Sequence, residues 1–153
     1  MSSLPQLQPL DQHNQLLQSH VAPPEWQNPS PEGRYNLVVI GAGPAGLVVA
    51  AGAAGLGARV ALIERDLMGG DCLNVGCVPS KGIISAARAA AAVRNSQEFG
   101  IEVPDGWNVD FSKAMGRMRE LRAGMSHHDA ATRFTELGID VYFGGGKFVS
   151  NDT

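Results

Sequence analysis

Dense clusters of Lys and Arg are absent from this sequence of 153 residues, which has a formal net charge of -3 and only 18% charged residues. A protein that binds nucleic acid or an anionic membrane surface usually presents a basic patch or stripe. We therefore expect neither nucleic acid nor a membrane as a partner.

The sequence also lacks the basic and then apolar start of a secretory signal, since no Lys or Arg precedes Arg34. Export is therefore not predicted, and we expect a cytoplasmic location. The uncharged stretch over residues 37–58 would be long enough to cross a bilayer as one helix. Glycines and a proline interrupt it early, which favours a strand, a turn and a helix instead.

Cysteine is scarce: only Cys72 and Cys77 occur. In a protein that is not exported, a close pair is typical of redox or metal chemistry rather than of a structural disulfide. Two thiolates alone cannot complete a tetrahedral zinc site, and we interpret His127 and His128 as solvated or helix-start residues. No resident metal is predicted, although two sulfurs can satisfy a soft ion such as Hg(II).

Residues 1–33 are rich in Gln and Pro and show little apolar periodicity. Such a composition buries too little apolar surface to offset the entropy cost of ordering the chain. We therefore expect a flexible extension over residues 1–33, and we assign no function to it. The folded unit is expected over residues 34–153.

The pattern after Asn36 predicts an α/β fold. Residues 37–40 form an apolar run typical of a buried parallel strand, and residues 59–63 predict a second one. The alanine-rich segment between them predicts a helix with Pro44 in its first turn. A strand, a crossover helix and a neighbouring parallel strand form a right-handed βαβ unit. Helices are also expected over residues 79–95 and 110–137, the latter interrupted near 124–126, and a strand over 139–143.

The hexapeptide GAGPAG, residues 41–46, matches the dinucleotide fingerprint G-x-G-x-x-G. Gly41 would permit the tight turn, Gly43 would let the backbone approach a pyrophosphate, and Gly46 would let helix and strand pack closely. Glu64, at the end of the second strand, would accept hydrogen bonds from ribose hydroxyls. The alternative is a simple turn with Glu64 on the surface, and the fingerprint alone does not separate FAD from NAD.

The segment MGGDCLNVGCVPSK, residues 68–81, places the two cysteines five positions apart. On an ideal helix this spacing means a rise of about 7.5 Å and an angular offset of about 140°, beyond the usual reach of a disulfide. The segment must therefore be distorted locally, and Gly76 would permit this. A strained or exposed disulfide is easier to reduce than a structural one.

GGDCLNVGCVPSK resembles the redox motif of the pyridine nucleotide-disulfide oxidoreductases, which include glutathione reductase, lipoamide dehydrogenase and mercuric reductase. The resemblance covers roughly residues 35–150 and includes GAGPAG and the segment GARVALIER around Glu64. It implies a Rossmann-like FAD-binding domain with a parallel central sheet, here incomplete. It also implies that Cys77 lies next to the flavin, that Cys72 exchanges with substrate, and that Lys81 lies near the reactive edge of the ring.

The same resemblance implies a set of residues around the FAD. The set comprises Gly41, Gly43, Pro44, Ala45, Gly46, Glu64, Arg65, Gly70, Asp71, Cys72, Lys81 and Gly146. Many members of the family have threonine in place of Asp71, and an acid near the pyrophosphate would add repulsion.

The implied reaction passes electrons from NAD(P)H through FAD to the disulfide of Cys72 and Cys77, and then to a small disulfide or metal-ion substrate. From the likeness of CLNVGCVPSK and residues 126–148, we favour a mercuric reductase-like enzyme. The alternatives are a dihydrolipoamide dehydrogenase-like enzyme and a non-catalytic flavin- or thiol-metal-binding module. No second G-x-G-x-x-G and no C-terminal His base occur, so we expect the N-terminal part of a longer, homodimeric enzyme, inactive alone.

Overall fold

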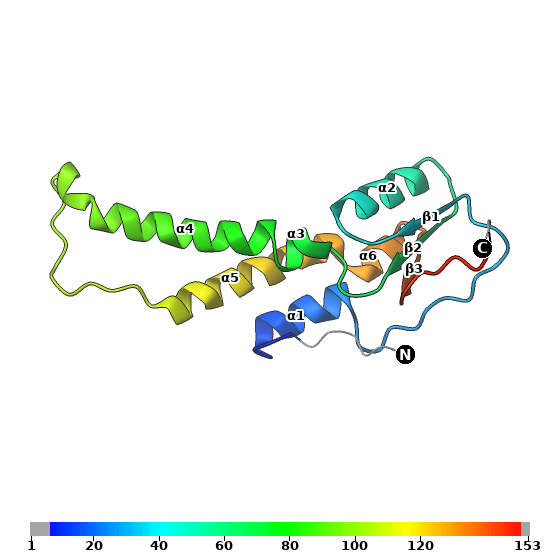
Figure 1. Ribbon diagram of the computed structural model, residues 1–153, viewed down its shortest axis with the longest axis horizontal. Coiled ribbons are helices and arrows are strands. Elements are labelled where there is room, and N and C mark those ends of the chain that lie inside the picture. The colour runs from blue at the N-terminus through cyan, green and yellow to red at the C-terminus, as the bar shows by residue number, and fades with distance from the viewer. Residues whose placement is uncertain (1–6, 151–153) are drawn as a thin grey trace.

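The computed structural model describes residues 7–150 of the protein. Three parallel strands form a sheet in the order β1-β2-β3, which confirms the predicted α/β class. Helices join and flank the strands (Figure 1). In chain order the elements are α1 (Gln12–Val21), β1 (Leu37–Ile40), α2 (Pro44–Gly55), β2 (Val60–Glu64), α3 (Gly70–Asn74), α4 (Cys77–Arg94), η1 (Ser96–Phe99), α5 (Phe111–Met125), η2 (Ser126–Asp129), α6 (Ala131–Glu136) and β3 (Asp140–Phe143).

The central strand β2 is the most buried element of the sheet, as its apolar sequence requires. Its register pairs Ile63 with Ile40 of β1 and Glu64 with Phe143 of β3. The carboxyl ends of all three strands therefore lie at one edge of the sheet. In open α/β sheets this edge is the usual place for a ligand.

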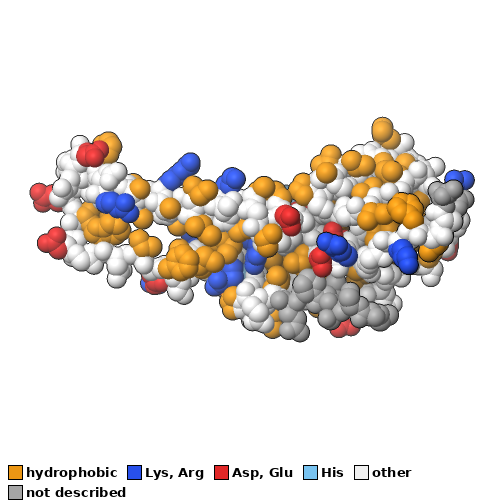
Figure 2. All heavy atoms as spheres, in the orientation of Figure 1, with side chains coloured by type: hydrophobic (Ala, Val, Ile, Leu, Met, Phe, Trp, Pro, Cys, Tyr) orange, Lys and Arg blue, Asp and Glu red, His pale blue; other side chains and the backbone are white. Residues whose placement is uncertain are grey.

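The stretch 37–58 forms strand β1, a turn and helix α2, as predicted. Within residues 7–150 there is no helix with the length and apolar character needed to cross a membrane. Apolar side chains are nevertheless spread over the surface of the sheet region and the helices, as Figure 2 shows. Val48 and Leu56 are the most exposed of those on or next to α2, with 73% and 91% of their surfaces accessible.

Helices α4 and α5 run back along each other and extend away from the sheet as a two-helix arm (Figure 1). They pack closely where Gly82 meets Met118, because a Cβ on Gly82 would lie 3.3 Å from the Met118 side chain. The predicted interruption is also present. Helix α5 ends at Met125 and is followed by the 3-10 turn η2, so that α6 starts as a separate helix.

The structure corrects the prediction of a flexible extension over residues 1–33. Residues 12–21 form helix α1, whose first turn is capped by the Asp11 side chain, which accepts a hydrogen bond from the Asn14 backbone N–H at 2.9 Å. Leu17 and Val21, one helical turn apart, are completely buried in the core. Average composition misses such a narrow apolar stripe. The part of the prediction that concerns residues 1–6 lies outside the described residues.

The segment after α1 continues this packing along the free edge of β3. The Trp26 indole N–H donates to the Val141 carbonyl at 3.3 Å. The Asn28 side chain exchanges two hydrogen bonds with the backbone of Phe143, at 2.9 and 2.8 Å, as a neighbouring strand would. Unpaired strand edges are prone to association, so this contact protects the edge of β3. Residues 12–28 are therefore part of the folded unit.

Candidate cofactor site and cysteine pair

The turn between β1 and α2 has the geometry that the fingerprint predicts. A Cβ on Gly46 would lie 1.9 Å from the Gly41 carbonyl oxygen, so only glycine allows this close contact of helix and strand. Helix α2 begins with Pro44, and its N-cap residue is Gly43. Because Gly43 has no side chain, the first helical N–H groups stay accessible. These groups and the positive end of the helix dipole favour a phosphate.

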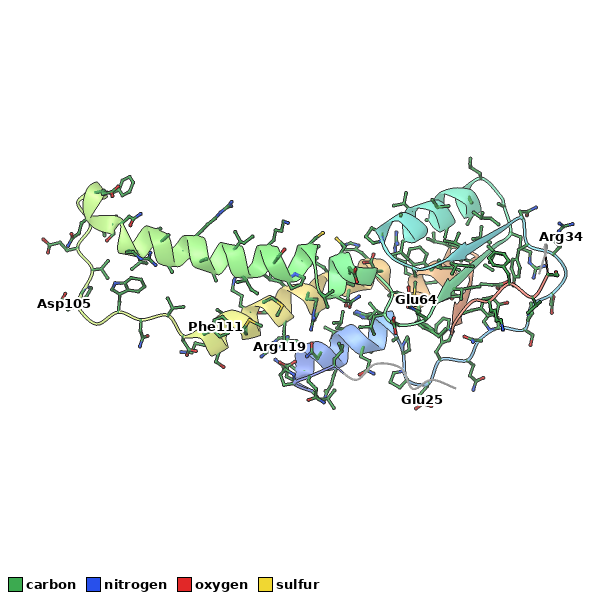
Figure 3. The ribbon with its side chains drawn as sticks, viewed as in Figure 1. Glu25, Arg34, Glu64, Asp105, Phe111 and Arg119 are labelled. Atoms are coloured by element: carbon green, nitrogen blue, oxygen red, sulfur yellow. The ribbon has the colours of Figure 1, made fainter. Side chains whose placement is uncertain are left out.

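Glu64 lies at the carboxyl end of β2 beside this turn, with only 8% of its surface exposed (Figure 3). One carboxylate oxygen accepts the backbone N–H of Ala42 at 2.7 Å, and the other accepts that of Asp66 at 2.8 Å. Each oxygen keeps a further lone pair for a ligand hydroxyl. Glu64 thus also holds the fingerprint turn against β2, a role that the sequence did not reveal.

A cavity of about 640 Å³ opens at the carboxyl ends of the strands. Its walls include residues 144–146, after β3, and Asn74 at the end of α3. Six of the predicted cofactor residues line it, namely Gly41, Glu64, Arg65, Gly70, Asp71 and Gly146. Four others, Gly43, Pro44, Ala45 and Gly46, line a second and more open hollow that shares Gly41 with the first. Cys72 and Lys81 line neither hollow.

The start of the cysteine segment packs directly on the fingerprint turn. The Gly69 N–H donates to the Ala42 carbonyl at 2.8 Å. A Cβ on Gly70 would lie 2.8 Å from the Cα of Gly43, closer than real side chains come. The two motifs, separate in the sequence, therefore form the walls of one site.

Cys72 lies in α3, and Cys77 is the first residue of α4. The two helices are separated at Gly76, which has φ -111° and ψ -103° and donates to the Asp71 carbonyl at 2.5 Å. A Cβ on Gly76 would lie 2.8 Å from that same oxygen, so the local distortion requires glycine. The expected break between the cysteines is thus confirmed.

Both cysteines are free thiols, Cys72 partly exposed and Cys77 exposed. A hydrogen bond with Cys77 is the main cause that raises the pKa of the Cys72 thiol. Lys81 follows Cys77 by about one turn of α4 and is exposed. The structure thus brings the two thiols together, one residue beyond the wall of the cavity formed by Gly70 and Asp71.

No sequence motif predicts a role for Asp129, a half-buried residue at the end of η2. Its Oδ2 lies 2.8 Å from the position that a Cβ on Gly69 would occupy, three residues before Cys72. Burial raises the pKa of the Asp129 carboxyl, and its charge adds to the causes that raise the pKa of Cys72. Its neighbours His127 and His128 are exposed, as expected. Among residues 7–150 no group of three or more His, Cys, Asp or Glu side chains could hold a metal ion.

The family model for pyridine nucleotide-disulphide oxidoreductases matches residues 35–153. The chain belongs to this family. Among curated relatives, the dihydrolipoyl dehydrogenase of Acholeplasma laidlawii is 37% identical over 120 residues, which are 76% of this chain and 34% of the relative. A Bacillus subtilis dihydrolipoyl dehydrogenase is 34% identical over 119 residues, 75% of this chain and 24% of the relative. That of Geobacillus stearothermophilus is 46% identical over 76 residues, 50% of this chain and 16% of the relative.

The chain therefore spans about a third or less of the length of these relatives. Membership of the family confirms the resemblance that the motifs indicate. The preference for a mercuric reductase finds no support in these relatives, whose names agree with the dihydrolipoamide dehydrogenase alternative.

Proposed function

We propose that this chain forms the N-terminal part of an FAD-binding domain in a disulfide oxidoreductase of the dihydrolipoyl dehydrogenase type. The contact of Gly70 with Gly43 carries the proposal, because it joins the cysteine segment to the fingerprint turn. The whole protein would exchange electrons between NAD(P)H and a small dithiol or disulfide, and we expect it to act as a homodimer. The names of the curated relatives support the choice of this type over a mercuric reductase.

The residues at the strand ends fit FAD. The backbone N–H groups at the start of α2 suit the pyrophosphate, and the remaining lone pairs of Glu64 suit the ribose hydroxyls. Gly46 and Gly70 allow close backbone contacts around the turn that any side chain would prevent. Asp71 is an unfavourable residue, because its exposed carboxylate on the cavity wall would repel phosphate. Its exposure lets salt and water screen that repulsion.

Bound FAD would supply the relay between the nicotinamide and the cysteines. Reduction of a disulfide between Cys72 and Cys77 takes two electrons and two protons and gives the two thiols present in the structure. Toward a disulfide substrate, the Cys72 thiol would lose its proton, and the resulting thiolate would attack one sulfur and expel the other half as a thiolate, which takes up that proton. Cys77 would then attack the Cys72 sulfur of this mixed disulfide, which releases the second half and restores the disulfide. The raised pKa of Cys72 favours the protonated thiol over the thiolate in the reduced pair.

A matched pair of variants tests the cofactor site in the full-length protein. Glu64→Gln keeps the size of the side chain but replaces one acceptor oxygen with an NH2 donor, so the side chain cannot accept from both Ala42 and Asp66 and offers a ribose hydroxyl one acceptor fewer. Hydrogen bonds to a charged group contribute about 1.5–3 kcal/mol, so FAD should bind roughly tenfold more weakly or worse. Glu136→Gln, at an exposed position of α6, is the control. Unchanged FAD affinity in Glu64→Gln, measured by flavin fluorescence, would contradict the proposed site.

A further inference from the structure

We propose that Arg122 is a positioning residue for the cysteine pair, because its guanidinium joins the N-terminal helix α1 to the backbone of α3, which carries Cys72. Arg122 lies in α5, far from both cysteines in the sequence and outside every motif that the sequence contains. The inference rests on the proposed redox role of Cys72 and Cys77.

Helix α3 needs external support because it has only five residues. A helix this short is not stable alone, and its last carbonyl groups have no partner within it. The Asn74 side chain holds its start, because Nδ2 donates to the carbonyls of Met68 at 3.1 Å and Gly70 at 2.9 Å. Arg122 holds its end, where Nη1 donates to the Asn74 carbonyl at 2.7 Å.

The guanidinium is fixed in turn by α1. Its Nη2 donates to Oδ1 of Asn14 at 2.5 Å, and the Asn14 amide donates to the Pro9 carbonyl at 2.7 Å. Asn14 is completely buried, and Arg122 is 8% exposed. One side chain of α5 therefore connects the N-terminal helix to the residue that ends α3.

Arg122 makes both of these bonds to neutral oxygens. Burial lowers the pKa of its guanidinium, while the charge of Asp11 acts in the opposite direction. Asp11 itself is hydrogen-bonded at 2.6 Å to Arg119, which lies on the same helix as Arg122. A buried cation without a bonded carboxylate is costly, and apolar packing in its place is often at least as stable. Stability alone thus does not account for Arg122, whereas control of the α3 backbone does.

The position of α3 decides how readily the two thiols meet. Cys72 lies two residues before Asn74, and Cys77 lies three residues after it, beyond the break at Gly76. Without the bond from Arg122, α3 is free to move relative to α4, and the effective concentration of one thiol at the other falls. A lower effective concentration makes the disulfide less stable against glutathione.

The test is a redox titration of the full-length, flavin-loaded protein in glutathione buffers. After an acid quench and alkylation, mass spectrometry counts free thiols in the tryptic peptide of residues 66–81, which contains both cysteines. Arg122→Met should lower the equilibrium constant for the disulfide about tenfold, a shift of about 30 mV. Arg119→Met is the matched control, since it removes the bond to Asp11 one turn earlier in α5 and leaves Asn74 bonded. Its equilibrium constant should stay within about twofold of the wild-type value, because sites that share no partner act almost independently.

An unshifted constant in Arg122→Met, or an equal shift in Arg119→Met, would overturn the inference. If Arg122→Met does not fold, Arg122→Lys serves as the test, because the single Nζ of lysine cannot take the places of both Nη1 and Nη2. That variant should shift the constant in the same direction, and an unchanged constant overturns the proposal. A wild type that forms no disulfide at all would refute the redox function itself, and this inference with it. A wild-type disulfide with unshifted variants would refute only the role of Arg122.

Discussion

Cys72 and Cys77 differ in surroundings as well as in position. Cys72 is partly covered within α3 and has Asp129 in its neighbourhood, whereas Cys77 is exposed at the start of α4. The nearby Cys77 and the negative charge of Asp129 both raise the pKa of Cys72. Because the thiolate is the reactive form, the reactivity of Cys72 depends on its partner and on pH.

Removing the partner should therefore make Cys72 reactive at lower pH. In Cys77→Ala the hydrogen bond that keeps the Cys72 thiol protonated is lost, so its pKa falls and the thiolate appears earlier as pH rises. The pH at which iodoacetamide alkylates Cys72 at half its maximal rate should move down relative to the fully reduced wild type. Ser80→Ala, which removes only a hydroxyl bonded to the Cys77 carbonyl, should leave it unchanged. An unchanged or higher midpoint in Cys77→Ala would contradict this description of the pair.

Among the helices and strands, α1 departs most from the fold expected from the sequence. Its hydrogen bonds and apolar contacts reach α5, α6 and η2. His20, near its end, is hydrogen-bonded to the buried Ser126 hydroxyl at 2.7 Å. Burial lowers the pKa of this His20 imidazole, which agrees with a structural position. The helix is thus an integral element of the fold.

Two adjacent leucines of α1 test this conclusion. Leu17 is completely buried, whereas Leu16 faces outward with 45% of its surface exposed. Leu17→Ala should lower the free energy of unfolding by about 2–5 kcal/mol, because a core cavity remains. Leu16→Ala should stay within about 0.5 kcal/mol of the wild type. Urea unfolding of the full-length protein measures both free energies. Equal stabilities of the two variants would indicate that residues 12–21 are a flexible extension, as composition predicts.

The sequence predicted best what depends on local chemistry. The fingerprint turn, the strands beside it and the break at Gly76 follow from short motifs whose glycines are required by close backbone contacts. It predicted poorly what depends on distant partners. The hydrogen-bond partners of Trp26 and Asn28 lie 115 residues away in the sequence, and Asn14 and Arg122 are 108 residues apart. No local sequence pattern predicts such contacts. Asp129 could not be predicted for the same reason, because only the fold brings its side chain close to Gly69.

At the scale of the whole molecule, the parts are arranged around the carboxyl edge of the sheet. The cavity opens there, the cysteine helices start beside it, and the arm of α4 and α5 leads away from it (Figure 1). Arg122 of α5 links α1 to this region through its hydrogen bonds to Asn14 and Asn74. The Val21 carbonyl at the end of α1 also accepts the Met68 N–H at 3.0 Å. The candidate cofactor site, the two thiols and the N-terminal helix thus belong to one continuous structure.

We propose that Cys72 and Cys77 accept two electrons from NAD(P)H as one redox unit. The direct measurement is to alkylate the full-length, flavin-loaded protein after an anaerobic acid quench, with and without prior NADH or NADPH. Trypsin cuts after Arg65 and Lys81 and releases both cysteines in one peptide, whose mass reports their state. We predict no alkyl group on this peptide before reduction and two after it. The same number of alkyl groups before and after reduction would contradict the claim.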